Sequence, residues 1–275
     1  MKPSRPPAAA LVLLLLWSLL PLLWQLLTSL RRPEALVLEG ISSWTSGWTL
    51  DNYRQLLSGS PPFWRYLSNS CLVGASSTAL TLVLAVPAAY ALERLGSRWR
   101  RWISTALLAA AMFPYVLVFL ALLEVARQMH WGNQLLALAL PYSALSLPLA
   151  VLLLRAAFAD LPPELEDAAR LDGLNLWQRL RYVLLPLLAP ALGSTAILVF
   201  LFSWNEYPIA LTWLSRSDLL TLPTAMARIA GSSVFTVPYG AFAAATVLGS
   251  LPLVLLVLLF QRQIVSGLTQ GAVKG

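Results

Sequence analysis

The amino-acid sequence predicts an all-α membrane protein with six transmembrane helices. Of its 275 residues, 58% are hydrophobic and only 11% are charged, and the mean hydropathy is +0.71. Soluble proteins carry about 25% charged residues, so much of this chain requires lipid around it. A transmembrane helix needs about 20 apolar residues. Six runs of at least 22 residues contain no Asp, Glu, Lys or Arg, and each predicts one span: 6–30, 66–92, 102–123, 128–154, 182–205 and 229–261.

The six predicted spans belong to a single transmembrane domain that covers 1–275. Their approximate bounds are 9–29, 69–92, 103–124, 133–155, 184–205 and 239–261. The first run is also compatible with a secretory signal peptide, because Lys2 and Arg5 precede the apolar stretch Leu11–Leu16. That run continues to Leu30 without an A-x-A-like cleavage site, which favours a retained span.

Aromatic residues and prolines mark the connections and the interiors of the spans. The segment 31–66 contains Trp44, Trp48 and Tyr53, which is typical of chain at the level of the lipid headgroups. Proline removes a backbone hydrogen bond, and membrane helices tolerate it where neighbours satisfy the freed carbonyl. The prolines inside the spans therefore either shape the helices or act as hinges along a pathway. They are Pro87, Pro114, Pro141 and Pro148.

The basic residues predict the orientation of the chain. With the N-terminus in the cytoplasm, 12 of the 19 Lys and Arg residues fall on the cytoplasmic side and 7 on the other. The strongest local signal is the cluster RLGSRWRR at 94–101. Positive residues favour the cytoplasmic side, so both termini are expected there. The same scatter of basic residues through short loops gives no support to nucleic-acid binding.

Two kinds of functional site are excluded by residue content. Cys71 is the single cysteine and His130 the single histidine, so a metal site built from these residue types is not expected. A phosphate-binding P-loop needs a G-K-[ST] sequence, and the chain's only lysines, Lys2 and Lys274, stand in none. Energy for any transport must therefore come from another subunit or from an ion gradient.

The segment 160–183 is the longest polar stretch on the predicted cytoplasmic side between two predicted spans. Pro162 and Pro163 with the acids that follow are typical of a helix start. Gly173 predicts the end of this helix, and Asn175 followed by Gln178 predicts a capping box that starts a second one. From this pattern alone the segment is either a helical hairpin against the inner membrane surface or a device that contacts a moving partner.

The run from Asp167 to Pro186 resembles the EAA motif of permease subunits in prokaryotic ATP-binding-cassette (ABC) importers. The family pattern is E-A-A, three residues, G, nine residues, then I-x-L-P. The matching residues are Asp167, Ala168, Ala169, Gly173, Val183, Leu185 and Pro186. Asp167 stands where the family usually has Glu, and Glu166 precedes it. In importers of this family the acid of the motif pairs with an ATPase subunit. Which of Asp167 and Glu166 would do so here is open.

The resemblance covers nearly the whole chain and is to the carbohydrate-uptake branch, in particular to the maltose-type second permease. The stretches that carry it are T-x-x-N-Y at Thr49, Asn52 and Tyr53, Asn69-Ser70, A-A-Y-A-L-E-R at 88–94, S-W-N-E-Y at 203–207, T-L-P at 221–223, and S-G-L-T-Q-G-A-V-K-G at 266–275. It implies the type I importer permease fold and a multi-pass position in a prokaryotic plasma (inner) membrane.

The resemblance also implies partners. They are a second homologous permease, two ATPase subunits that bind the ATP and Mg²⁺, an external solute-binding protein and membrane lipid. The chain itself is then no enzyme and holds no cofactor. The segment 160–183 would be a coupling loop that docks on an ATPase. The implied coupling residues are Glu164, Glu166, Asp167, Ala168, Ala169, Leu171, Asp172, Gly173, Leu174 and Pro186.

Two further regions gain implied roles. The cytoplasmic tail 262–275 resembles one that reaches the ATPases, with candidate contacts at Gly271, Lys274 and Gly275. The outer loop after the fifth span resembles one that enters the cleft of the binding protein. The candidates for its tip are Ala230, Gly231, Ser232 and Ser233.

The residues at the outer end of the fifth span are candidates for the substrate path. Sugar sites combine aromatic faces with hydrogen-bonding groups, and Trp204, Asn205, Glu206 and Tyr207 offer both. The same residues would also suit an interfacial aromatic cap with a solvated acid. Three other functions stay open: a permease for another solute such as a polyamine or phosphate, an ion-coupled transporter that uses Glu206, and a structural membrane protein.

Overall fold

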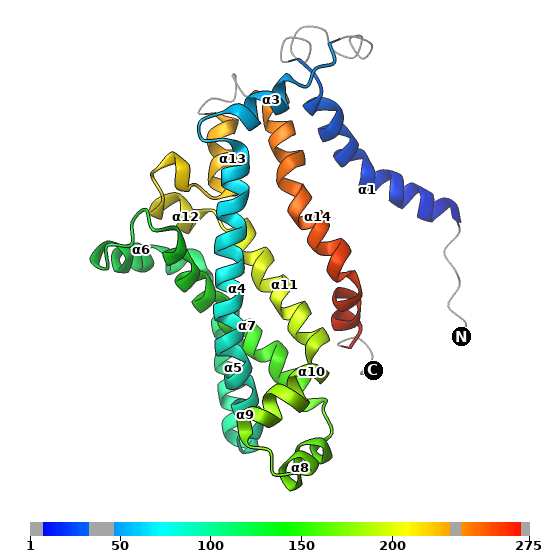
Figure 1. Ribbon diagram of the computed structural model, residues 1–275, viewed down its shortest axis with the longest axis vertical. Helices are drawn as coiled ribbons and strands as arrows, with labels where there is room; N and C mark the ends of the chain where they lie inside the picture. Colours follow the sequence, from blue (N-terminus) through cyan, green and yellow to red (C-terminus); the bar gives the residue numbers. More distant parts are fainter. Residues whose placement is uncertain (1–7, 33–46, 232–237, 271–275) are drawn as a thin grey trace. The chain divides into compact units, whose positions relative to one another are not determined.

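The computed structural model describes residues 8–32, 47–231 and 238–270. These residues are largely helical, and their one β-type contact is an isolated bridge between Arg31 and Trp48 (Figure 1). The chain divides into two compact units. The first comprises Met1–Leu67 and Thr224–Leu253, and the second comprises Ser68–Pro223 and Val254–Gly275.

The first unit contains α1 (Ala8–Ser29) and the short helix α3 (Asp51–Ser58). The first turn of α4 (Phe63–Arg94), most of α13 (Leu222–Ala230) and the first half of α14 (Tyr239–Gln270) complete it. All but α3 and α13 are long apolar helices.

Asn52 holds this unit together. Its side chain is buried, and its amide donates to the backbone oxygens of Ser29 at 2.9 Å and Arg31 at 2.8 Å. The Ser29 carbonyl lies at the end of α1, where it lacks a partner inside that helix, and Arg31 follows two residues later. The neighbouring Tyr53 hydroxyl lies 2.6 Å from Ser29 Oγ. Asn52 and Tyr53 of the T-x-x-N-Y stretch therefore serve to close the end of α1.

Replacing Gly240 by Ala is expected to disrupt this closure. A Cβ at Gly240 would lie 2.7 Å from Asn52 Nδ2 and 3.0 Å from the Arg31 oxygen. Overpacking of this kind costs about 1–3 kcal/mol. Thermal unfolding of the purified protein measures the loss. The matched control is Gly96→Ala, because nothing lies within 4 Å of a Cβ added there. Equal unfolding temperatures for the two variants would contradict the expectation.

The second unit contains most of α4 and the helices from α5 to α12. Their bounds are α5 (Ser97–Met112), η2 (Tyr115–Leu117), α6 (Phe119–Gln128), η3 (Leu135–Leu138), α7 (Ala139–Ala159), α8 (Pro163–Leu171), α9 (Leu176–Gln178), η4 (Arg179–Leu184), α10 (Leu185–Leu187), α11 (Ala189–Asn205), α12 (Pro208–Trp213) and η5 (Ser217–Leu219). The segment η4 is a π-helix. The start of α13 and the second half of α14 also belong to this unit.

Small and hydroxylated residues join the long helices of the second unit. A Cβ at Gly74 of α4 would lie 2.8 Å from the Phe200 ring of α11, so glycine permits this close approach. Ser203 of α11 donates to Ser77 of α4 at 3.0 Å, and Thr81 donates to Ser143 of α7 at 3.1 Å. Small residues and interhelical hydroxyl bonds are how helices associate in a membrane, where lipid removes the hydrophobic driving force.

Fewer single helices have the length and hydropathy of a membrane span than the six predicted spans. In the described part of the chain, four helices are long and apolar enough to cross a membrane: Val12–Ser29, Phe63–Arg94, Leu135–Ala159 and Tyr239–Gln261. A fifth span results if the bent pair Leu176–Leu187 and Ala189–Asn205 is taken together. The helices at the predicted first, second, fourth and sixth spans therefore exist as continuous elements.

The predicted third span, 103–124, is not one continuous helix. α5 ends at Met112, and α6 starts only at Phe119. The break lies at Pro114, which has no N–H to continue the helix and disfavours helical geometry in the residue before it. Phe113 is accordingly extended, with φ −69° and ψ 131°.

The predicted fifth and sixth spans also differ in shape. The chain bends by 81° between Leu187 and Ala189. Pro190 follows the bend and has no N–H to donate to the carbonyl four residues earlier. α14 continues to Gln270, beyond the expected start of a tail at 262.

Candidate functional site: the α8–α9 hairpin

Helix α8 begins and ends where its sequence predicts. Pro163 occupies its first position, where a missing N–H costs nothing, and Glu164 and Glu166 lie in its first turn. Gly173 adopts φ +78°, a left-handed conformation that favours glycine. The Gly173 N–H donates to the Arg170 oxygen at 3.0 Å and the Leu174 N–H to the Ala169 oxygen at 3.1 Å. This pair of bonds is a Schellman motif, so the predicted helix end is confirmed.

The second helix of the hairpin starts with the predicted capping box. The Gln178 N–H donates to Asn175 Oδ1 at 3.0 Å, and the Asn175 N–H donates to Gln178 Oε1 at 2.9 Å. Both halves of the box are present, which confirms the prediction. After Gln178 the backbone continues as the π-helix η4, which passes into α10 with Pro186. Figure 1 shows α8 and α9 beside the end of α4 and the start of α5.

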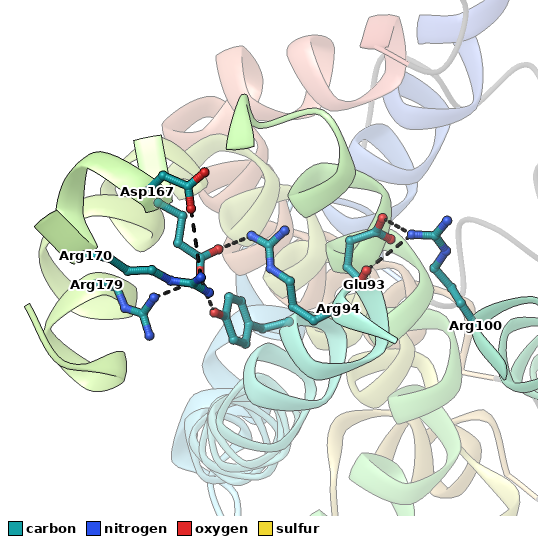
Figure 2. A network of polar contacts seen from close by, with 8 residues as sticks. Glu93, Arg94, Arg100, Asp167, Arg170 and Arg179 are labelled. Atoms are coloured by element: carbon teal, nitrogen blue, oxygen red, sulfur yellow. Dashed lines mark hydrogen bonds and ion pairs between the residues drawn. The ribbon is translucent and has the colours of Figure 1, made fainter. Parts of the chain in front are cut away.

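Glu166 points inward from α8 and is held by four side chains. It is buried, with a side chain only 4% exposed. Its carboxylate accepts from Tyr90 Oη at 2.5 Å, from Arg170 Nη2 at 3.1 Å and from Arg179 Nη1 at 3.2 Å. Arg94 also pairs with it. Figure 2 shows Arg94, Arg170 and Arg179 converging on one carboxylate.

These contacts join the hairpin to the long helix α4. Tyr90 and Arg94 stand one turn apart at the end of α4, more than 70 residues before Glu166 in the sequence. The Tyr90 ring packs edge-on against Phe158 of α7, with 5.6 Å between ring centroids. Glu166 and Tyr90 therefore connect α8 with α4 and α7.

The electrostatics of Glu166 favour its ionised form. Burial alone raises the pKa of this carboxyl, but the hydrogen bond from Tyr90 and the charges of Arg94 and Arg170 outweigh it and lower the pKa below its ordinary value. A carboxylate whose pKa is lower in the folded protein stabilises the fold above its unfolded-state pKa. That contribution is lost as the pH falls through the folded-state pKa.

A pH series is expected to show this contribution. Between pH 7 and the ordinary carboxyl pKa of about 4.5, wild type should unfold at a higher temperature than Glu166→Gln. Below that value the difference should shrink, because wild-type Glu166 becomes protonated and the variant does not titrate there. Thermal unfolding at stepped pH measures the difference. A difference that stays constant down to pH 3 would contradict the assignment.

The outward face of α8 is formed by residues at helical spacing. Glu164, Asp167, Ala168 and Leu171 follow each other at i, i+3, i+4 and i+7, and all four are exposed. The Leu171 side chain is 90% exposed, which is unusual for a large apolar residue. The Asp167 side chain is 71% exposed, and its ion pair with Arg170, one turn away on the same helix, is long at 3.9 Å. Ala169 is buried like Glu166, so the two faces of α8 are distinct.

The structure gives different surroundings to Glu166 and Asp167, the two acids between which the motif does not decide. The Glu166 carboxylate is buried and accepts hydrogen bonds from four side chains of the same chain. Asp167 instead faces outward beside Ala168 and Leu171. Among the other motif residues, Asp172, Gly173 and Pro186 are exposed and Leu174 is half-buried.

Two clusters near the hairpin carry roles that the sequence analysis did not assign. The stretch A-A-Y-A-L-E-R supplies Tyr90 and Arg94 to Glu166. Its Glu93 accepts from Arg100 of α5 at 2.7 Å and from Arg155 of α7 at 3.1 Å. In the sequence, the only sign of these roles is that Tyr90, Glu93 and Arg94 stand together at the end of a long apolar run. Their partners lie on other helices and cannot be read from spacing.

The candidate substrate-path residues differ in accessibility. Trp204 is buried and stacks on Phe200, with 5.6 Å between ring centroids. Glu206 is buried too, and it accepts from Tyr142 Oη at 2.5 Å and from the N–H groups of Ile209 and Ala210 at 2.8 and 3.1 Å. It thereby caps the start of α12, and both of its carboxylate oxygens accept hydrogen bonds from within the chain.

The structure describes some of the remaining substrate-path, loop and tail candidates. Asn205 is exposed, Tyr207 is half-buried, and the Asn205 amide donates to the Leu201 oxygen at 2.7 Å. Of the loop candidates, Ala230 ends α13 and Gly231 follows with φ +83°. Ser232 and Ser233 lie outside the described residues, as do the tail candidates Gly271, Lys274 and Gly275.

Comparison with known proteins identifies the family. Residues 81–270 match the family described as "Binding-protein-dependent transport system inner membrane component". The chain belongs to this family. It is therefore a permease subunit, an inner-membrane component of an ABC transport system and not its ATP-hydrolysing part.

Individual relatives cover nearly the full permease. The sulfoquinovosyl glycerol transport system permease protein of Agrobacterium fabrum is 39% identical over 274 residues, which is 100% of this chain and 94% of the relative. The trehalose transport system permease protein of Mycobacterium tuberculosis is 40% identical, over 94% of this chain and 93% of the relative.

A solved structure shares the fold of the permease. It is a chain of a bacterial ABC transporter involved in the import of the acidic polysaccharide alginate. The TM-score is 0.77, and the match covers 93% of this chain and 94% of that one. The sequence identity is 20%, so this likeness concerns the fold alone.

Proposed function

We propose that this permease belongs to an ABC importer that takes up a sugar or a sugar-derived solute from an external binding protein. The observation that carries the proposal is the family match, together with relatives named for sulfoquinovosyl glycerol and trehalose transport. The stretches at 203–207 and 266–275, which resemble the carbohydrate-uptake branch, support the same substrate class.

The working complex would contain a second homologous permease, two ATPase subunits and the binding protein. ATP and Mg²⁺ would bind to the ATPases. In this arrangement the chain is one transmembrane domain with six spans and both termini in the cytoplasm. The six charge-free runs and the excess of basic residues on one side support this topology. The region from α5 to α6 would supply the third crossing.

The outward face of α8 is the surface we assign to ATPase docking. It presents a carboxylate at Asp167, a small side chain at Ala168 and an apolar contact at Leu171. The small alanine allows close approach, and an exposed leucine gains free energy when a partner covers it. The Schellman motif at Gly173 ends the helix directly after this face.

Coupling then runs from α8 into the helices through Glu166. Closure of the ATPase pair around ATP would shift α8, and the contacts of Glu166 with Tyr90 and Arg94 would carry that shift to α4. Transport requires the ATP-bound and ATP-free states to favour different permease conformations. The cavity would open outward while the binding protein delivers solute and would reset after hydrolysis.

The outer residues and the tail complete the proposal. Asn205 and Tyr207 are the accessible candidates for solute contact, and Ala230–Ser233 would enter the cleft of the binding protein. Gly271, Lys274 and Gly275 would reach the ATPases.

The experiment that tests the function is ATPase activity of the purified complex in lipid, with and without binding protein and a panel of sugars. Stimulation by one sugar together with its binding protein is the expected result. Stimulation by a polyamine or by phosphate instead would replace the substrate class and keep the importer. A complex in which no ATPase subunit copurifies with the permease would overturn the importer itself.

A further inference from the structure

A hollow in the second unit is lined by arginines and hydroxyl side chains together with two leucines. Its volume is about 430 Å³, and it lies between α5 and the end of α7. Arg100, Arg101, Ser104 and Thr105 line it from one face of α5, and Arg155 lines it from α7. Neither the docking face of α8 nor the outer substrate-path residues take part in it.

The charge of the hollow is strongly positive. Arg100, Arg101 and Arg155 contribute three guanidinium groups to its lining, and the carboxylate of Glu93 pairs with two of them. Glu93 pairs with Arg100 and Arg155, and Figure 2 shows it against Arg100. One carboxylate against three guanidiniums leaves a surplus of two positive charges, which favours an anionic ligand.

Two donor atoms in the wall are shielded from solvent and lack a partner. Ser104 Oγ and Arg155 Nε make no hydrogen bond to any residue that the structure describes. Buried polar atoms are nearly always satisfied, and leaving one unpaired costs about 1–3 kcal/mol. A ligand with acceptor oxygens would reach these atoms only after the Ser104 and Arg155 side chains turn toward the hollow.

The residues around the hollow are of the kinds found at the level of the lipid headgroups. The apolar helix α4 ends at Arg94, and α5 begins three residues later at Ser97. Trp99 and Trp102 in the first turns of α5 are each 68% exposed, and exposed tryptophans are typical of the membrane–water interface. Further along, Leu108 and Leu152 line the hollow and provide apolar contact for the start of an acyl chain.

We propose that this hollow binds the phosphate of an anionic phospholipid. Arginine forms paired, charge-assisted hydrogen bonds with phosphate oxygens, and hydroxyls of Ser and Thr add further donors. Basic pockets between transmembrane helices are a known way of recognising anionic headgroups. A lipid held by α5 and α7 beside Glu93 would also fix the ends of these helices near the hairpin.

The test is native mass spectrometry of the purified transporter complex mixed with phosphatidylglycerol. Phosphatidylcholine with the same acyl chains is the lipid control, and inorganic phosphate is the competitor. Arg101→Gln and, separately, Ser104→Ala remove donors from the hollow. Arg98→Gln is the matched control, because Arg98 is an exposed arginine of the same helix turn that does not line the hollow.

Wild type and Arg98→Gln are expected to retain phosphatidylglycerol but not phosphatidylcholine. Arg101→Gln should retain about tenfold less, because it loses a charged hydrogen bond to phosphate. Ser104→Ala should show a smaller loss in the same direction. Equal retention by wild type and both hollow variants overturns the proposal, as does an equal loss in Arg98→Gln. Full displacement by millimolar inorganic phosphate overturns the lipid as ligand and identifies a free phosphate.

Discussion

Glu166→Gln is expected to break the link between α8 and α4 while leaving the complex assembled. Glutamine keeps an acceptor for Tyr90 but removes the negative charge that Arg94, Arg170 and Arg179 share. Charged hydrogen bonds contribute about 1.5–3 kcal/mol each, so the variant hairpin should move without carrying α4. We expect solute transported per ATP hydrolysed to fall about tenfold.

The measurement is paired transport and ATPase assays in proteoliposomes. Asp167→Asn is the matched control, because it removes the neighbouring carboxylate from the outward face of the same helix. It should weaken association of the ATPase subunits and leave the transport-to-hydrolysis ratio of assembled complexes near wild type. Unchanged coupling in Glu166→Gln, or uncoupling in Asp167→Asn alone, would show that the roles assigned to the two acids are wrong.

Glu206→Ala is expected to destabilise the permease by about 2–4 kcal/mol. The change leaves the hydroxyl of fully buried Tyr142 without its acceptor, which costs about 1–3 kcal/mol. It also removes the cap of α12, where the N–H groups of Ile209 and Ala210 lose their partner, at about 1 kcal/mol. Thermal unfolding in detergent and the yield of folded protein measure the effect.

Two further variants separate a structural from a solute-binding role of Glu206. Glu206→Gln keeps one acceptor oxygen and should be milder than Glu206→Ala, with an unchanged KM for solute. The combination of Glu206→Ala with Tyr142→Phe should cost less than the sum of the single changes, because they remove the two ends of one contact. A raised KM in Glu206→Gln at unchanged stability would show instead that Glu206 contacts the solute.

The local features of the hairpin were predictable because each depends on a few adjacent residues. Pro163 starts α8, Gly173 ends it in a left-handed conformation, and Asn175 with Gln178 closes a capping box. The apolar runs likewise predict where the long helices lie, since length and hydropathy alone decide that a segment suits a membrane.

The features that were not predictable depend on contacts between distant parts of the chain. Glu166 and Asp167 are adjacent acids, and only the approach of Tyr90 and Arg94 from α4 distinguishes them. Glu206 was expected at an accessible surface, and the contact from Tyr142 of α7 places it in the interior. The break at Pro114 could not be predicted from the proline alone, because α4 and α7 continue as helices through their own prolines.

The measurement that tests the central claim most directly is photocross-linking from the outward face of α8. A photoreactive phenylalanine analogue replaces Leu171, whose side chain is 90% exposed, and the assembled transporter is irradiated. Trp177, 73% exposed on α9, is the comparison position. The account predicts an adduct between the permease and an ATPase subunit from position 171, with a yield that changes between ATP-free and ATP-bound states. No ATPase adduct from position 171 in an intact, active complex would contradict docking through this face.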